Sequence, residues 1–192
     1  DSIHQVRMQG VSHVPEDRMT YGIMGDASIK ENMIADRYFQ PEYCKGGLLN
    51  AKKINQDADK YIKEYLVKCD DREQPVRMLS GGNIQKVVAA REFSSKPDLA
   101  VVCQPTRGID VGATEFVRKR IVELRDQGTA VLLISADLNE VMELSDSLIV
   151  MCEGEIAAYF EDSSAITEVE LGEYMLGLKK MSAEQIGDAV HE

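Results

Sequence analysis

The sequence has little positive charge and no long apolar run, and these two absences limit the partners that the chain can bind. It contains 22 lysine and arginine residues against 33 aspartate and glutamate residues, so its formal net charge is −11. An acidic chain repels the phosphates of DNA and RNA, and nucleic acid is therefore not an expected partner. No apolar stretch approaches the roughly 20 residues that span a bilayer, and no signal peptide is recognisable. Any association with a membrane is expected to go through a protein partner.

The cysteines are also too scattered to form a recognisable site. Cys44, Cys69, Cys103 and Cys152 include no Cys-x-x-Cys pair and have no cluster of histidines beside them. This spacing favours reduced, structural cysteines in a cytosolic protein over a metal site or a disulfide framework. With 192 residues, one domain with a possible subdomain is expected. The chain starts at Asp1 without a methionine, which suggests a fragment of a longer protein.

The first half of the sequence predicts one short strand followed by helices. Residues 11–14 form a strand pattern that ends at Pro15, because proline cannot continue a ladder. Ser28 and Glu31 have the spacing of a helix start, and that helix is expected over residues 28–38. Apolar residues recur at helical spacing within residues 48–68, which predicts the longest helix.

From residue 97 onward strands and helices alternate. We expect strands over 99–103 and 129–135 and helices over 111–127 and 137–144, with Gly128 ending the first of these helices. Residues 147–152 and 155–160 form a predicted hairpin across Glu153 and Gly154. Terminal helices are expected over 171–178 and 182–190. This alternation predicts an α/β fold with a mainly parallel sheet covered by helices.

The most informative stretch is Leu-Ser-Gly-Gly-Asn-Ile-Gln-Lys at residues 79–86. Ser80 can cap an amphipathic helix that begins at about residue 82 and runs to about 93. Gly81 and Gly82 carry no side chains, so an anion could approach the backbone N–H groups of the first turn closely. Taken alone, the stretch is more typical of a plain glycine turn before a capped helix than of an anion site.

The order of the motifs resembles an ATP-binding-cassette ATPase. Residues 79–85 resemble that family's signature motif, the strand 99–104 stands at its Walker B strand, and residues 108–111 resemble its D-loop. The stretches Val-Ser-His-Val-Pro-Glu-Asp-Arg at 11–18 and Pro-Thr-Arg-Gly-Ile-Asp-Val-Gly-Ala at 105–113 are similar to the second cassette of fused double ATPases that serve simple-sugar and nucleoside importers. The resemblance covers about residues 11–175.

The resemblance implies a truncated P-loop NTPase core, with a mainly parallel sheet and a helical subdomain that carries the signature motif. It divides the chain into four parts: a remnant of a core strand at 1–15, the Q-loop and helical subdomain at 16–93, the ATPase core with Walker B strand, D-loop and switch region at 94–162, and a C-terminal helical tail at 163–192. A chromosome-organising relative would need a long coiled coil in the helical part, and no heptad pattern is present.

In this family two cassettes face each other, and the signature motif of one closes over the nucleotide of the other. The resemblance therefore implies that this chain contributes nucleotide contacts in trans. The signature positions are Leu79, Ser80, Gly81, Gly82, Asn83 and Gln85, the D-loop positions are Gly108, Ile109, Asp110 and Val111, and Glu16 stands where the Q-loop usually has glutamine.

The chain's own nucleotide site is expected to be degenerate. The Gly-x-x-x-x-Gly-Lys-Ser/Thr phosphate loop is absent from the 192 residues. By resemblance, Cys103 occupies the position of the magnesium-binding aspartate, Gln104 that of the catalytic glutamate and Ala136 that of the switch histidine. A neutral thiol is a poor Mg²⁺ ligand, and an amide cannot take a proton from water. No metal ligand is therefore expected in this chain.

The sequence thus predicts the nucleotide-binding half of an importer ATPase that is inactive alone. The resemblance implies ATP and Mg²⁺ in the intact subunit, with neither bound tightly to this chain. It implies a partner cassette, membrane permease subunits, an extracytoplasmic substrate-binding protein acting indirectly, and a location at the cytoplasmic face of the membrane. Two alternatives stay open: a non-catalytic regulatory or interaction module, and a cassette that acts outside transport, against which the acidic charge and the short helical insertion count.

Overall fold

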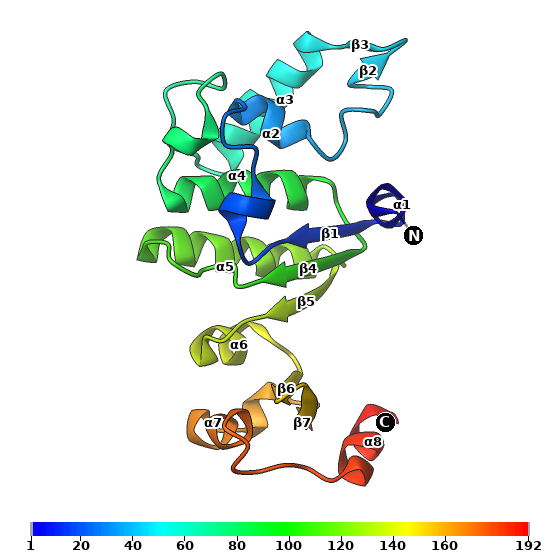
Figure 1. Ribbon diagram of the computed structural model, residues 1–192, viewed down its shortest axis with the longest axis vertical. Coiled ribbons are helices and arrows are strands. Elements are labelled where there is room, and N and C mark those ends of the chain that lie inside the picture. The colour runs from blue at the N-terminus through cyan, green and yellow to red at the C-terminus, as the bar shows by residue number, and fades with distance from the viewer. Residues whose placement is uncertain (1, 192) are drawn as a thin grey trace. The chain divides into compact units, whose positions relative to one another are not determined.

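The computed structural model describes residues 2–191, with side chains up to residue 187 (Figure 1). Two compact units divide between Leu132 and Leu133, within the last strand of the first unit. The four-part division predicted from the sequence is finer than this and stays a prediction. None of the helices in residues 2–191 is both long and apolar enough to cross a bilayer.

The first unit combines a three-stranded sheet with a group of helices. In chain order its elements are α1 (Ile3–Met8), β1 (Val11–Val14), the π-helical turn η1 (Arg18–Gly22), α2 (Ile29–Ile34), β2 (Cys44–Lys45), β3 (Leu48–Leu49), α3 (Ala51–Glu64), the 3-10 turn η2 (Val76–Met78), α4 (Gly81–Ser94), β4 (Leu99–Cys103), α5 (Val111–Asp126) and β5 (Ala130–Ile134). The sheet order is β1-β4-β5, and β1 runs parallel to β4 with Val11 opposite Leu99 and Val14 opposite Val102.

Helix α4 is the centre of this unit and is more buried than an amphipathic helix. Ten of its 14 residues are buried, including the polar side chains of Gln85, Arg91 and Glu92. It contacts α2, α5, β1 and η1, so it has neighbours on several sides. The sequence prediction of one apolar face was wrong because these buried polar residues interrupt the apolar pattern.

Buried Glu92 joins α4 to the N-terminal segment. Its carboxylate accepts hydrogen bonds from Arg7 Nη2 at 3.0 Å, from the Arg91 guanidinium Nε at 2.9 Å and from the backbone N–H of His13 at 3.1 Å. Burial raises the pKa of Glu92, but the two guanidinium groups outweigh it and hold that pKa below its usual range. The charge is therefore buried with its partners.

Three segments of the first unit differ from the sequence prediction. Helix α1 was not predicted, although Ser2 and Gln5 form a capping box at its start. The predicted helix 48–68 is shorter because Leu48–Leu49 pairs with Cys44–Lys45 across Gly46 and Gly47, which both have positive φ. The predicted helix 28–38 ends at Ile34, and the buried Arg37 that follows hydrogen-bonds the backbone carbonyl of Arg91.

The second unit contains a hairpin packed against helices. Its elements are α6 (Leu138–Leu144), β6 (Leu148–Cys152), β7 (Glu155–Phe160), the 3-10 turn η3 (Ser163–Ala165), α7 (Glu168–Met175) and α8 (Ala183–His191). The antiparallel pair β6–β7 confirms the predicted hairpin, and Leu148, Val150, Ala158 and Leu171 form the centre of its core. Helix α7 begins three residues earlier than predicted because Thr167 caps it.

Candidate functional site

The site begins where the loops after β1 and β4 meet. These strands are parallel neighbours, with Val14 opposite Val102, and their arrowheads point the same way in Figure 1. The carboxyl ends of parallel neighbours lie at one edge of the sheet, where ligands of open α/β sheets bind. Residues 15–18 and residues 104–110 are therefore brought together beside the start of α4.

The start of α4 is capped by Ser80, as the sequence predicts. The Ser80 hydroxyl oxygen accepts hydrogen bonds from the Asn83 backbone N–H at 3.5 Å and from Asn83 Nδ2 at 2.9 Å. The Asn83 side-chain oxygen in turn accepts the backbone N–H of Lys68 at 2.8 Å. Ser80 is exposed, and because it acts here as an acceptor, its own O–H remains available as a donor. The N–H groups of Gly81 and Gly82 belong to the first helical turn, which has no acceptors of its own.

The second component is the start of α5. Asp110 caps this helix by accepting the backbone N–H of Ala113 at 2.9 Å, and Asp110 and Val111 are both exposed. Gly82 packs directly against this cap. A Cβ atom on Gly82 would lie 2.7 Å from Asp110 Oδ2 and 2.8 Å from the Ala113 Cβ. Gly82 is therefore needed for the close approach of α4 and α5.

This contact predicts the effect of adding one methyl group. Gly82→Ala is expected to lower the free energy of unfolding by about 1–3 kcal/mol, because α5 or the Asp110 cap must move. Urea unfolding followed by circular dichroism measures the change. Gly172→Ala in α7 is the matched control: its added Cβ meets nothing within 4 Å, so it should raise stability by about 0.5–1 kcal/mol. A Gly82→Ala protein as stable as the wild type would contradict the close packing.

The predicted Q-loop and the loop that leads into the predicted D-loop are joined by polar contacts. Glu16 forms an ion pair with Arg107. The guanidinium of Arg18 donates to the backbone carbonyl of Arg107 at 2.7 Å through Nη1 and to that of Gly108 at 3.2 Å through Nη2. Glu16 therefore contacts Arg107, the residue directly before the predicted D-loop positions 108–111.

A hollow lies between the start of α4 and the start of α5. Its lining includes Lys68, Ser80, Asn83, Lys86 and Asp110. The Lys86 ammonium donates to the Leu66 carbonyl at 3.1 Å, and Lys68 is exposed. Two lysines, a hydroxyl donor and the positive end of the α4 dipole therefore surround the hollow. This donor set suits the phosphate part of a ligand, and Asp110 is its acidic component.

The chemistry at the end of β4 is different. Cys103 Sγ lies 3.9 Å from His13 Nε2. Partial burial and the nearby Glu16 carboxylate raise the pKa of the Cys103 thiol, so the thiol stays neutral at neutral pH. Gln104 follows with a positive φ of 46°. Within residues 2–191 no group of three or more His, Cys, Asp or Glu side chains could hold a metal ion, and this strand end offers no hard carboxylate set for Mg²⁺.

Of the remaining predicted site residues, one belongs to the second unit and two have buried side chains. Ala136 belongs to the second unit, in the bend between β5 and α6. The side chains of Leu79 and Gln85 are 9% and 2% exposed, so they support α4 from inside and do not face the hollow. Gly108 is exposed and Ile109 is partly buried.

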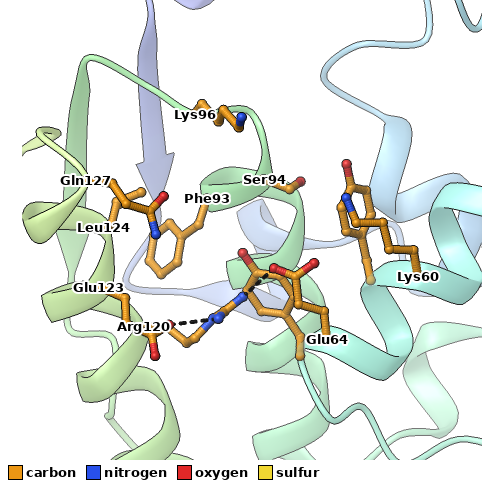
Figure 2. Close-up of a pocket in the computed structure, with 11 residues that line it drawn as sticks. Lys60, Glu64, Phe93, Ser94, Lys96, Arg120, Glu123, Leu124 and Gln127 are labelled. Carbon is orange, nitrogen blue, oxygen red and sulfur yellow. Dashed lines mark hydrogen bonds and ion pairs between the residues drawn. The ribbon is translucent and has the colours of Figure 1, made fainter.

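A second hollow lies at the other end of α5. Its central charged group, Arg120, is paired with carboxylates of the protein. Figure 2 shows Arg120 directed between Glu64 and Glu123. Its guanidinium donates to Glu64 at 2.9 Å and to Glu123 at 2.8 Å, and it lies 4.1 Å from the centre of the Tyr65 ring. The charge of Arg120 is thus compensated within the protein, so this hollow offers no cation for an anionic ligand at that point.

The sequence analysis missed the roles of Arg18, Arg107, Lys68 and Lys86. The two strands that precede Arg18 and Arg107 were predicted to the residue, so pairing them in parallel would have brought the loops that follow them together. No pattern in the sequence indicates the lysines, because they reach the hollow only through the packing of α4.

Comparison with known proteins finds relatives that are named as import ATP-binding proteins. The chain is 41% identical over 179 residues to the guanosine import ATP-binding protein NupO of Bacillus subtilis, a match that covers 93% of this chain and 35% of that protein. It is 40% identical over 173 residues to the nucleoside import ATP-binding protein NupA of Lactococcus lactis, covering 90% and 34%. It is 42% identical over 149 residues to the glucose import ATP-binding protein TsgD13 of Haloferax volcanii, covering 77% and 27%. The chain thus spans about a third of the length of these relatives.

Solved structures agree on the fold. A putative metal-chelate type ABC transporter in an inward-facing conformation matches with a TM-score of 0.70 and 15% identity, over 88% of this chain and 64% of that one. A dimeric ATP-binding cassette in a post-hydrolysis state with ADP and phosphate matches with a TM-score of 0.64 and 18% identity, over 81% and 64%. No family model matches the chain. The fold is the α/β fold of these cassettes, with a parallel sheet and helical elements, as predicted.

Proposed function

We propose that this chain, an ATP-binding-cassette ATPase of the type found in sugar and nucleoside importers, completes a nucleotide site that a partner cassette holds. The observation that carries this proposal is the start of α4. There the exposed Ser80, the lysines of the hollow and the helix dipole form a donor set for phosphate. In this function Ser80 and the N–H groups of Gly81 and Gly82 contact the terminal phosphate, while Asp110 and Val111 line the interface.

The same proposal makes the chain's own site non-hydrolytic. Cys103 is a neutral thiol whose pKa is raised, and Gln104 has no proton-accepting carboxylate. These residues do not fit Mg²⁺, so no step of hydrolysis is assigned to them. Ala136 offers no polar group to a phosphate. ATP and Mg²⁺ belong to the intact subunit, and this chain alone neither holds them tightly nor turns ATP over.

The partners that we propose are supported by the names of the relatives, which are import ATP-binding proteins. We assign the chain to the second cassette of a fused double-cassette subunit, with the other cassette as its phosphate-holding partner. The subunit works at the cytoplasmic face of the membrane through permease subunits, which an extracytoplasmic binding protein supplies with a nucleoside or simple sugar. Exposed Met19, Tyr21 and Met24, in and after η1, give the Q-loop segment an apolar surface for a permease.

A second function is a regulatory module that docks a partner without contributing to ATP turnover. The degenerate strand end favours it, because the chain lacks the groups for hydrolysis. The start of α4 contacts nucleotide in the first function and does not contact it in the regulatory module.

Photolabelling of the intact subunit separates them. An ATP analogue with a photoreactive group on its γ-phosphate is expected to label the tryptic peptide of residues 78–86, and excess ATP should prevent the labelling. The purified chain alone, titrated with Mg-ATP, should show little heat. Labelling of the peptide around Gln104 in place of residues 78–86, or saturable binding by the chain alone, would contradict the proposal.

A further inference from the structure

Arg18 joins three parts of the site: the loop after β1, the loop after β4 and the start of α4. Its two terminal nitrogens donate to the backbone carbonyls of Arg107 and of Gly108, the first of the predicted D-loop positions. The same guanidinium lies against the first turn of α4, because a Cβ atom on Gly81 would be 3.1 Å from Arg18 Nη2. One group thus touches the loop after β1, the loop after β4 and the start of α4.

The backbone of Arg18 is itself held in place. Asp17 caps η1 by accepting the N–H groups of Met19 and Thr20 at 3.0 Å each. The other end of η1 packs on α4: a Cβ atom on Gly22 would lie 3.4 Å from Val88 Cγ2 and 3.1 Å from the Arg18 Cβ. The guanidinium therefore extends from a fixed base, and its position is reproducible.

A further contact between the two loops is an exposed ion pair. The Glu16–Arg107 ion pair is exposed, with 66% and 55% of the Arg107 and Glu16 side chains accessible, and an exposed pair contributes little in water. Arg18, whose side chain is partly buried, makes two hydrogen bonds to backbone carbonyls of the loop after β4. Arg18 therefore adds two hydrogen bonds to the exposed Glu16–Arg107 pair in linking the two loops.

Arg18 is also not placed for maximum stability. Its Nε is buried without a hydrogen-bond partner among the described residues, and a buried unsatisfied donor is unfavourable. Local conflicts of this kind are typical of residues retained for function.

From this geometry we infer that Arg18 is a positioning residue, which holds the D-loop against the first turn of α4 so that Ser80 and Asp110 meet a partner's nucleotide as one rigid unit. The inference rests on the proposed function. Nucleotide binds first to the phosphate loop of the partner and meets α4 only on closure. Loss of Arg18 should therefore affect the closed state and leave the first binding step unchanged.

The kinetic test uses the intact subunit with Arg18→Met, which keeps the aliphatic stem and removes the donors. We expect kcat for ATP to fall about tenfold while KM stays within about twofold. Arg18→Lys keeps the charge but not the forked geometry, and it should recover only part of the rate. Arg72→Met is the matched control, because Arg72 pairs with Asp59 at 2.8 Å and contacts none of the three parts.

Hydrogen exchange of the same variants tests the contact without reference to activity. In Arg18→Met the amides of residues 106–110 should exchange faster, while those of residues 117–124 in α5 stay unchanged. If Ser80→Arg stops turnover but Arg18→Met retains both the wild-type kcat and the wild-type exchange, the inference is wrong and the proposed function stands. If Ser80→Arg has no effect, the proposed function itself fails, whatever Arg18 does.

Discussion

Arginine in place of Ser80 is expected to lower ATP turnover of the intact subunit by about 100-fold or more, comparable to the loss of an oriented donor at a developing charge. The substitution removes the hydroxyl donor and the cap of α4, and its bulk fills the hollow between α4 and α5. An arginine side chain at this position would block the close approach of a phosphate to the N–H groups of the first helical turn. Initial rates of phosphate release measure the effect.

Two controls show whether the effect comes from the start of α4. Ser95→Arg introduces the same group at the other end of α4, where Ser95 is exposed and its hydroxyl donates to the Glu92 carbonyl at 2.7 Å. Gln104→Ala changes the chain's own strand end. Both variants should keep turnover near the wild-type rate. Intact turnover in Ser80→Arg together with its loss in Gln104→Ala would reverse our assignment of the two sites.

The second large effect is on stability. Glu92→Ala is expected to lower the free energy of unfolding by about 3–5 kcal/mol, because it leaves the guanidinium groups of Arg7 and Arg91 without their buried partner. Chemical denaturation measures it. Glu115→Ala on the exposed side of α5 is the matched control and should change stability by less than about 0.5 kcal/mol.

The same carboxylate makes stability depend on pH. The pKa of Glu92 is lower in the folded chain than the model-peptide value of 4.5, so the folded state favours its charged form. Its contribution is complete above the unfolded pKa and is lost as pH falls through the folded pKa. The wild type should therefore lose stability in acid below about pH 4.5 more steeply than Glu92→Gln. Equal slopes for the two proteins would show that Glu92 is not held in its charged form.

The sequence was sufficient for elements whose ends are marked by local chemistry. Strands β1 and β4 match their predicted ranges to the residue, since Pro15 and the Gln104-Pro105 turn end them. Gly128, with a φ of 97°, ends α5 as expected. Helix α1 and the Gly46-Gly47 hairpin also have local signals, a capping box and a glycine pair, and these could have been found.

The site was predictable only in its separate pieces. The Ser80 cap depends on neighbours in the sequence, so the motif was sufficient to predict it. The burial of Gln85 and Glu92 could not be predicted, because polar side chains do not indicate a central helix. The role of Arg18 depends on two backbone carbonyls about 90 residues away in the sequence. Every residue has a backbone carbonyl, so the sequence does not indicate which of them accept a hydrogen bond from Arg18.

The central claim is that the start of α4 meets a nucleotide held by another cassette. A structure of the complete ATP-loaded assembly tests it most directly, through the distance from Ser80 Oγ to the γ-phosphate oxygens. Our account predicts a hydrogen bond of about 3 Å, with the phosphate bound by the partner's loop. A Ser80 hydroxyl beyond hydrogen-bonding reach of every phosphate in that assembly would contradict it.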